Sequence, residues 1–372
     1  MALVHDWLCG YRGGEAVLDR LARLVRDRHE PAGLWVMVSD GRPVAPAVDA
    51  LSVRTSVLQE LPYAATRLRR HLLPLYPRAV ADLSRSIGDE HRRAPIDLVL
   101  STSSAAVKGV QAPPGVPHLC YCHTPPRYLW SQQDQYAAQG RLASAGLALA
   151  GPFLRRWDAA TSRHVTSFIA NSRHTARLIE RCYGRTSTVV HPPVRTGYFT
   201  VDPARRRENF WLFAGALEPY KRPDLAIEAA RLAGVKIVVA GTGSILPQLR
   251  SRYTGPGVEF LGRVPDEGLR ELYRRAALLL FPQIEDFGIV AVEAQACGCP
   301  VVARRAGGAL ETVIDGLTGR FFDNPESASI ARAAASLGSV QPTDCRRHAE
   351  TFGEEFFDRR MASIVRDMIG MR

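Results

Sequence analysis

Short apolar runs alternate with helical patterns along this chain, and this alternation limits its fold more than any other feature. In the first half, apolar residues recur at helical spacing over 15–25. Apolar runs typical of buried strands lie at 33–39, 97–103, 118–123 and 167–172. A second series begins at 209–217 and continues with runs at 236–241, 258–262, 278–282, 300–304 and 319–322. Strands that alternate with helices form parallel sheets covered by helices. The sequence therefore predicts an α/β protein.

The two series are separated by a segment that favours neither helix nor strand. Pro192 and Pro193 stand together, and the polar segment 201–209 (VDPARRREN) follows them. At roughly 150 residues per domain, the 372 residues correspond to two or three domains. We expect an N-terminal domain over 1–196 and a C-terminal domain over 197–351. The tail from about 352 to 372 is amphipathic and is expected to form a helix.

The composition excludes several classes of protein. Hydrophobic residues make up 46% of the chain and charged residues 23%, as in globular rather than disordered proteins. No stretch approaches the ~20 consecutive apolar residues of a membrane-spanning helix. The first residues, MALVHDWL, lack the basic and long apolar regions of a signal peptide. We therefore expect a cytoplasmic protein.

The seven cysteines give no sign of a metal or redox site. Cys120 and Cys122 are separated by a single residue, and so are Cys297 and Cys299. Neither zinc-binding motifs nor the redox C-x-x-C motif has this spacing. We interpret the cysteines as reduced thiols that act as small buried hydrophobic residues. No metal or other cofactor is expected.

The formal net charge of +11 favours an anionic partner, such as nucleic acid, an acidic lipid surface or a phosphorylated substrate. The segment 67–80 (RLRRHLLPLYPRAV) combines leucines with arginines, although Pro74 and Pro77 interrupt any single long helix. Such a segment can rest on an anionic membrane at the inner face of the cell, or it can be an ordinary solvated face rich in arginine. No recognition helix, finger or RNP motif accompanies the charge, so nucleic acid is not expected as a partner.

A motif in the second series carries the clearest chemical signal. Glu285 and Glu293 are the first and last residues of EDFGIVAVE, and Gly288 between them begins a run that reads as a helix. The unpaired N–H groups and partial positive charge of a helix N-terminus suit a phosphate. Glu293 lies among apolar residues, and burying its carboxylate without partners is unfavourable. Sugar hydroxyls would be suitable partners, so the motif predicts a nucleotide-sugar site.

Further motifs accompany this one along most of the chain. They are YCHTPPRYLW (121–130), FIANSRHTARLIERCYG (168–184), HPPV (191–194), PYKRPDLAIEA (219–229) and VEFLGRVPDEGLRELYRRA (258–276). Their content and order resemble the retaining glycosyltransferases of family 4. The resemblance implies the GT-B fold, in which two Rossmann-like domains face each other across a cleft with their parallel sheets. It also implies that the C-terminal helix, about 352–372, packs back on the N-terminal domain, which binds the acceptor.

The resemblance assigns donor-binding roles to residues of the second series. Lys221 falls at the position of a phosphate-binding lysine, whereas Ala216 stands where relatives usually have an arginine. Without a metal, a diphosphate needs about two positive charges nearby. Arg222 is the first choice to replace the missing arginine, and Arg304 and Arg305 are the alternatives. Further donor contacts are expected from Glu285 with sugar hydroxyls, Glu293 with ribose hydroxyls, the backbone of Phe287, Gly288, Ile289 and Val290, and Arg263 and Val264 at the nucleobase.

Residues of the first series complete the expected site. Gly13 and Gly14 follow the first strand and open a helix, so their N–H groups can approach a phosphate or the acceptor, although a glycine pair can also be a plain turn. His123 ends a strand, and the resemblance places it beside the transferred sugar rather than in a structural role. Arg127, in the same motif, would contact the acceptor or a phosphate. The loop GTGS (241–244) reads equally as a phosphate loop or as a tight turn.

The resemblance implies transfer of a hexose with retention of configuration, catalysed by His123, Glu285 and Lys221. The HDW start, YCHTPPRYLW and PYKR together resemble a bacterial subgroup rich in mannosyltransferases of polysaccharide and O-antigen assembly, so GDP-mannose is the first choice of donor. No DxD metal motif is present on a suitable strand and loop, which agrees with metal-independent GT-B chemistry. Attack on the face that the diphosphate leaves is favoured over a mechanism with Glu285 as nucleophile.

Several alternatives stay open at this point. The donor can be a UDP-sugar, and the acceptor can be a glycan, a lipid-linked molecule or a small molecule with a free hydroxyl. A nucleotide-sugar epimerase or a phosphorylase would use the same fold. A basic nucleic-acid-binding protein without catalytic activity is the alternative from a different class, and salt-sensitive retention of RNA or DNA would identify it.

Overall fold

The computed structural model describes residues 1–11, 13–66, 72–131 and 141–370. It divides into two units, each built on its own parallel sheet. The first unit comprises Met1–Pro193 and Phe357–Arg372, and the second comprises Val194–Phe356. The sequence suggested the change of domain at 196/197 and the return near 352. The two sheets confirm the predicted α/β class with two Rossmann-like domains.

The first unit contains seven parallel strands in the order β3-β2-β1-β4-β5-β6-β7. They are β1 (Ala2–Leu8), β2 (Gly33–Ser39), β3 (Val53–Thr55), β4 (Val99–Ser103), β5 (His118–Cys122), β6 (Ser167–Ala170) and β7 (Ser187–Val189). The strand order reverses between β1 and β4. In open α/β sheets, ligands bind beyond the carboxyl ends of the strands at such a switch point.

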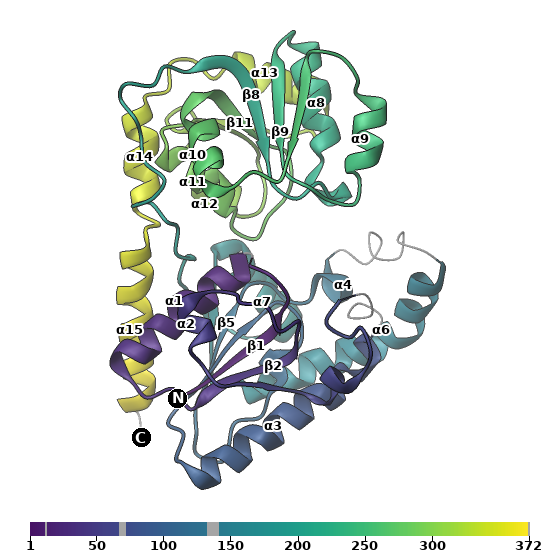
Figure 1. Cartoon of the computed structure of the whole chain (residues 1–372), viewed down its shortest axis with the longest axis vertical. Coiled ribbons are helices and arrows are strands. Elements are labelled where there is room, and N and C mark those ends of the chain that lie inside the picture. Colours follow the sequence, from purple (N-terminus) through teal and green to yellow (C-terminus); the bar gives the residue numbers. More distant parts are fainter. Residues whose placement is uncertain (12, 67–71, 132–140, 371–372) are drawn as a thin grey trace. The chain divides into compact units, whose positions relative to one another are not determined.

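Helices cover both faces of this sheet (Figure 1). They are α1 (Gly13–Arg28), α2 (Pro46–Asp49), α3 (Tyr76–Arg93), α4 (Arg127–Trp130), α6 (Arg141–Thr161), α7 (Arg173–Tyr183) and α15 (Glu354–Gly370), with short 3-10 turns η1 (Val57–Glu60), η3 (Leu73–Leu75), η4 (Val107–Gly109) and η5 (Ser162–His164). α1 and α15 pack on the face that carries Leu3, whereas α3 and α6 pack on the face that carries Val4. This division follows from the alternation of side chains along a strand.

Local sequence explains where two of these helices begin and end. α3 begins at Tyr76, and Pro77 lies in its first turn, where the missing N–H would have no partner in any case. For α7, the hydroxyl of Ser172 accepts a hydrogen bond from the Thr175 N–H at 3.0 Å, and Gly184 ends the helix in the left-handed conformation. α7 is therefore fixed directly after β6.

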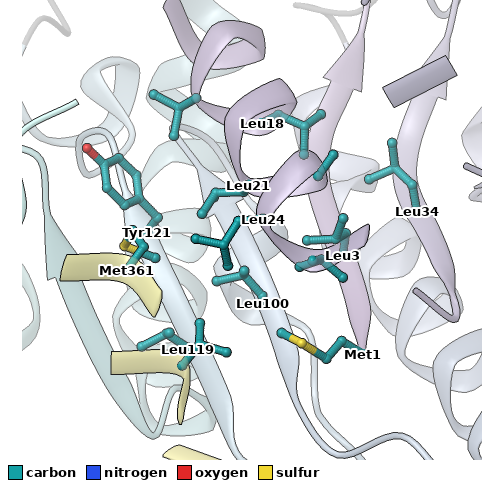
Figure 2. Close-up of a cluster of buried hydrophobic side chains, with 14 of the residues drawn as sticks. Met1, Leu3, Leu18, Leu21, Leu24, Leu34, Leu100, Leu119, Tyr121 and Met361 are labelled. Atoms are coloured by element: carbon teal, nitrogen blue, oxygen red, sulfur yellow. The ribbon is translucent and has the colours of Figure 1, made fainter. Parts of the chain in front are cut away.

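The core between α1, the sheet and α15 holds the C-terminal helix on the first unit. Figure 2 shows the leucines of α1 facing leucines of the strands, with Met361 of α15 in the same cluster. The ring of Phe357 meets that of Tyr121 edge to face at 5.8 Å. Arg20 of α1 donates two hydrogen bonds to Asp358, at 2.8 and 2.5 Å. α15 is thus part of the folded first unit.

The second unit contains six parallel strands in the order β10-β9-β8-β11-β12-β13. They are β8 (Glu208–Ala214), β9 (Lys236–Ala240), β10 (Val258–Gly262), β11 (Ala276–Phe281), β12 (Val301–Arg304) and β13 (Gly319–Phe322). The connecting elements are η6 (Pro219–Lys221), α8 (Pro223–Leu232), α9 (Leu246–Arg252), α10 (Asp266–Arg275), α11 (Ile289–Ala296), α12 (Ala309–Thr312), α13 (Ser327–Ala335) and α14 (Pro342–Glu350). The order reverses between β8 and β11, which makes that point the expected ligand site of this unit.

The second sheet has a separate core on each face. Leu212 of β8 and Val301 of β12 belong to the cluster that includes α11, whereas Phe213 and Val302 belong to the cluster that includes α8. The strands are therefore buried on both faces, as their continuous apolar sequences indicate. Among the described helices, none combines the length and the apolar character required to cross a bilayer.

Candidate functional site

The switch point of the second unit brings together two residues that the sequence assigned to the site. Lys221 follows β8 through η6, and Glu285 follows β11. The Lys221 ammonium donates a hydrogen bond to the Glu285 carboxylate, and the two side chains are only 17% and 14% exposed. A charged donor and a charged acceptor thus lie beyond the carboxyl ends of neighbouring strands. This is the position where open α/β sheets bind ligands.

The backbone of the loop that carries Glu285 is fixed by glycines. Gly308 donates its N–H to the Glu285 carbonyl at 2.8 Å. A Cβ on Gly308 would lie 2.3 Å from the Phe287 Cα, and one on Gly307 would lie 2.4 Å from the Glu285 carbonyl oxygen. Gly288, just before α11, has a φ of 96°, which side chains rarely adopt. Close packing of two loops therefore sets the direction in which Glu285 and the first turn of α11 point.

Glu293 lies in α11 among buried apolar residues and is itself half-buried. The Tyr273 hydroxyl lies 3.5 Å from Glu293 Oε2, which is a long hydrogen bond. Burial raises the pKa of the Glu293 carboxyl to about 7, and the nearby charge of Arg195 offsets part of this increase. The carboxylate therefore has little stabilisation from the protein and suits an added donor such as a sugar hydroxyl.

The arginines near this site differ in how they are paired. Arg222 donates hydrogen bonds to Asp224, the shortest at 2.9 Å, and Arg305 pairs with Asp315 and Asp323 at 3.2 and 3.0 Å. The guanidinium of Arg304 forms no hydrogen bond or ion pair with any described residue. Arg304 ends β12 and is half-buried on the side of the sheet that carries α8. It is the least neutralised of the three arginines.

The loop after β9 packs against the loop after β8. A Cβ on Gly241 would lie 1.8 Å from the Gly215 carbonyl oxygen, and one on Gly243 would lie 2.3 Å from the Leu217 carbonyl oxygen. The two glycines of GTGS are therefore required by the structure, because two turns approach each other too closely for a Cβ atom. After β10, Arg263 is exposed, and Val264 packs partly against the core that includes α11. Phe287 is buried in that same core, and Ile289 and Val290 pack partly against it.

The first unit brings the other predicted residues to its own switch point. Gly13 and Gly14 open α1 directly after β1. A Cβ on Gly14 would lie 3.8 Å from His123 Nε2 and 3.7 Å from His5 Cε1, so the glycine lies between the two imidazole rings. His123 follows β5, and its carbonyl accepts a hydrogen bond from the Asn171 side chain at 2.9 Å. Arg127 is the first residue of α4 and is half-buried.

A buried carboxylate organises the loop beside these histidines. Asp6 is 1% exposed and accepts hydrogen bonds from four consecutive backbone N–H groups, those of residues 104–107, at 2.6 to 3.0 Å. These bonds fix the turn that follows β4. Next along the chain, the buried Lys108 pairs with the buried Asp158 at 2.9 Å, and Trp130 donates its indole N–H to Asp158 at 2.8 Å. The loop after β4 is therefore tied to α4 and α6.

Three residues that contact or adjoin the predicted site residues were not assigned from the sequence, two in the first unit and one in the second. The Nδ1 atom of His5 lies 2.5 Å from Thr102 Oγ1. The Asn171 side chain donates a hydrogen bond to the His123 carbonyl, and the Tyr273 hydroxyl donates a long one to Glu293. His5 interrupts an apolar strand and Asn171 directly follows one, so each could have been noticed as a polar residue beside a buried strand. Tyr273 has no such signal, because it lies on the amphipathic α10.

The remaining sequence interpretations concern cysteines, metals and the basic segment. Five of the seven cysteines are buried, all are free thiols, and burial raises the pKa of the Cys120 thiol to about 12. Within the described ranges, no group of three His, Cys, Asp or Glu side chains could hold a metal ion. Residues 67–71 of the basic segment lie outside the described residues. In the rest of it, Leu75 is exposed and Tyr76 is buried.

Both halves of the chain match models of known sequence families. Residues 11–198 match the family model described as Glycosyltransferase Family 4, and residues 198–352 match the one described as Glycosyl transferases group 1. The chain is 38% identical over 191 residues to D-inositol 3-phosphate glycosyltransferase of Mycobacterium sp. (strain KMS), a match that covers 44% of this chain and 43% of that protein. It is 34% identical over 235 residues to the protein of the same name in Mycobacterium tuberculosis (strain ATCC 25177 / H37Ra), covering 54% and 48%. The chain thus matches about half the length of these curated relatives.

Solved structures show the same fold across the chain. HepE of Anabaena, in complex with UDP-glucose, has a TM-score of 0.69 and 19% identity, covering 98% of this chain and 99% of HepE. Sucrose-phosphate synthase of Thermosynechococcus elongatus has a TM-score of 0.76 and 16% identity, covering 100% and 99%. The architecture is the GT-B fold expected from the sequence. Because the first family model alone covers about half of the chain, this protein belongs to glycosyltransferase family 4.

Proposed function

We propose that this protein transfers a hexose from a nucleotide sugar to a hydroxyl group with retention of configuration and without a metal ion. The observation that carries the proposal is the Lys221–Glu285 pair at the switch point of the second unit. A donor diphosphate would compete with Glu285 for the Lys221 ammonium. Binding would then release the Glu285 carboxylate to accept hydrogen bonds from hydroxyls of the sugar. The resting site therefore holds both charges in place until the donor arrives.

Stabilisation of the leaving diphosphate is the main catalytic contribution in this proposal. Lys221 and the N–H groups at the start of α11 would receive the negative charge that grows as the bond from the sugar C1 to the diphosphate breaks. The acceptor oxygen forms its bond to C1 on the same face, and its proton passes to the departing phosphate oxygen. Glu293 would hold the ribose, and Arg263 and Val264 would contact the base. This scheme needs no protein nucleophile.

Two donors have specific support. The HDW start with YCHTPPRYLW and PYKR favours mannose from GDP-mannose. A UDP-sugar is the second candidate, because the structural neighbour HepE was solved with UDP-glucose. For the acceptor, the name of the mycobacterial relatives suggests an inositol phosphate, and a glycan or a lipid-linked hydroxyl would also suit the proposal. In the first unit, His123 would lie beside the transferred sugar, Arg127 would contact the acceptor or a phosphate, and the N–H groups of Gly13 and Gly14 would approach a donor phosphate or the acceptor.

The test is release of nucleotide by the purified protein from GDP- and UDP-sugars, with and without EDTA. We expect EDTA-resistant turnover, and a loss of more than about tenfold in Lys221→Ala, because a charge-assisted contact to the leaving group contributes roughly 1.5–3 kcal/mol. Glu293→Ala is expected to lose a similar factor. Wild-type rates in both folded variants would refute the site. Nucleotide release without a glycosidic product, or dependence on phosphate, would indicate an epimerase or a phosphorylase instead.

A further inference from the structure

Two large apolar side chains project into solvent from one face of α6. Leu149 is 84% exposed and Phe153 is 61% exposed. They lie one turn apart, and the exposed Pro152 lies between them on the same face. α6 lies at the periphery of the first unit (Figure 1). Its opposite face is well packed, since Leu154 is buried in the core shared with α3. The exposed residues are therefore an outer stripe of a helix that is otherwise held by the fold.

The same stripe continues into positive charge. Arg156 lies one turn beyond Phe153 on α6 and is exposed, and Arg155 beside it is half-buried. Arg163 is also exposed and lies in η5, directly after the end of α6 at Thr161. None of these guanidinium groups forms an ion pair or hydrogen bond with any residue in the described ranges. In this unit and in the other, many arginines pair with acids, for example Arg20 with Asp358 and Arg275 with Glu208. Among the residues that the structure describes, nothing neutralises the arginines that follow Phe153.

Negative charge is missing from this stripe for a structural reason. Asp158 is the single acid between 141 and 163, and it is 0% exposed. It pairs with Lys108 at 2.9 Å and accepts hydrogen bonds from Trp130 and Tyr183 at 2.8 and 2.9 Å. The fold therefore buries the one carboxylate of the segment 141–163. What remains on the outer face is apolar at one end and positive at the other.

We propose that the stripe from Leu149 to Arg163 docks on the surface of an anionic lipid bilayer. Leu149 and Phe153 would enter the boundary between headgroups and acyl chains, and Arg155, Arg156 and Arg163 would contact lipid phosphates. The part of the stripe on α6, from Leu149 to Arg156, is about 10 Å long and would lie in the plane of the interface. This surface is distinct from the segment 67–80 considered from the sequence. The proposal also goes beyond the proposed function, because it concerns the surface to which the protein binds and not the reaction that it catalyses.

Size and charge favour a bilayer over a protein partner. A stable protein interface buries about 800 Å² on each side, and one leucine with one phenylalanine supplies roughly half of that at most. A second copy of this chain would also set the arginines of one stripe against the apolar side chains of the other in an antiparallel arrangement, or arginine against arginine in a parallel one. An anionic lipid surface provides both an apolar layer and phosphates at the required depth.

The test is co-sedimentation of the full chain with phosphatidylcholine vesicles that contain or lack phosphatidylglycerol. We expect binding to the anionic vesicles that falls as salt is added. The double variant Leu149→Ser/Phe153→Ser should weaken binding by about tenfold or more, because two apolar side chains no longer leave water. Arg156→Gln/Arg163→Gln should weaken binding to the anionic vesicles several-fold. Both variants should keep the wild-type thermal stability, since the changed side chains are exposed.

Leu232→Ser is the matched control, because Leu232 is 64% exposed on α8 in the second unit. It should bind vesicles like the wild type. The proposal is overturned if the wild type does not sediment with anionic vesicles, or if the Leu149→Ser/Phe153→Ser variant binds as well as the wild type. It is also overturned if light scattering shows a wild-type dimer that this variant converts to a monomer, with no vesicle binding by either. Nucleotide release in the absence of vesicles should be the same in all variants, so failure here is distinguishable from failure of the proposed function.

Discussion

A single carboxyl group, that of Glu293, couples the site to pH. Burial raises its pKa from 4.5 to about 7. Between pH 4.5 and pH 7 the carboxyl group is therefore mostly protonated in the folded state and mostly ionised in the unfolded state. Stability contributed by this group is therefore lost as pH rises from about 4.5 to about 7, and the loss is complete above pH 7. In physical terms, the protein carries an unfavourable buried charge at neutral pH. A bound donor that supplies hydroxyl groups would relieve it.

Replacing this charge should stabilise the protein at high pH. We predict that Glu293→Gln melts at a higher temperature than the wild type at pH 8, by roughly 3–7 °C, and that the difference largely disappears at pH 5. Thermal unfolding of both proteins at the two pH values measures this. An equal difference at pH 5 and pH 8 would mean that the carboxyl does not titrate in this range.

Arg304, whose guanidinium pairs with no described residue, is the residue we expect to supply the second positive charge at the diphosphate. Arg304→Met should weaken binding of GDP or UDP by about 10- to 100-fold, because a charge-assisted hydrogen bond contributes roughly 1.5–3 kcal/mol. Binding of the corresponding nucleoside should change little. Calorimetric titration of both ligands makes the comparison.

Arg305→Met is the control for this prediction, because Arg305 is already engaged by Asp315 and Asp323. It should change diphosphate affinity much less than Arg304→Met. If the two variants lose equal affinity, the effect is one of overall charge rather than of a specific contact. If Arg222→Met alone loses affinity, the first choice made from the sequence is the correct one.

At the scale of elements, contact between two loops holds the Glu285 loop in place. We predict that Gly308→Ala lowers the stability of the second unit by about 2–4 kcal/mol, because its Cβ would collide with the backbone of Phe287. Nucleotide affinity should fall as well. Gly257→Ala is the control, since nothing lies within 4 Å of the Cβ it would add. Urea unfolding measures both variants, and equal stability of the two would show that the loops can separate without cost.

The sequence predicted most of the strands because their signal is local. The runs 33–39, 258–262 and 319–322 coincide with β2, β10 and β13. β3 (Val53–Thr55) and β7 (Ser187–Val189) were missed, since each has three residues at an edge of the first sheet and lacks a long apolar run. The long helix α6 was also missed, because its outer face is apolar and hides the usual amphipathic pattern.

The site was predicted as a set of residues but not as a set of contacts. Glu285 and Lys221 were assigned from their motifs, yet they are 64 positions apart and their direct pairing depends on the adjacency of β8 and β11. The same holds for Gly14 and His123, which approach each other because β1 and β5 both lie beside β4. Long-range pairing of this kind follows from the order of strands in the sheet, which no local sequence pattern predicts. The roles of these residues stay predictions until the variants are measured.

At the scale of the whole molecule, the first unit depends on the C-terminal helix α15 for its stability, whereas the second unit does not. Removing Phe357–Arg372 should unfold the first unit, because Met361 and Val365 leave its core and Arg20 loses Asp358. The second unit has its own core on both faces of its sheet and should stay folded. Limited proteolysis of the truncated protein should therefore cut within 1–193 and spare 194–356. Preferential cutting of the second unit would contradict this division.

The course of the chain through α15 also has a mechanical consequence. The second unit is inserted between Pro193 and Phe357, whereas β1 and α15 both belong to the first unit. A force applied between β1 and α15 would therefore be borne by the contacts that hold α15 on α1 and the first sheet. The inserted second unit would carry no load until α15 detaches from the first unit. Pulled from these two elements, the molecule would yield first at the contacts between α15 and α1, while Lys221 and Glu285 stayed paired.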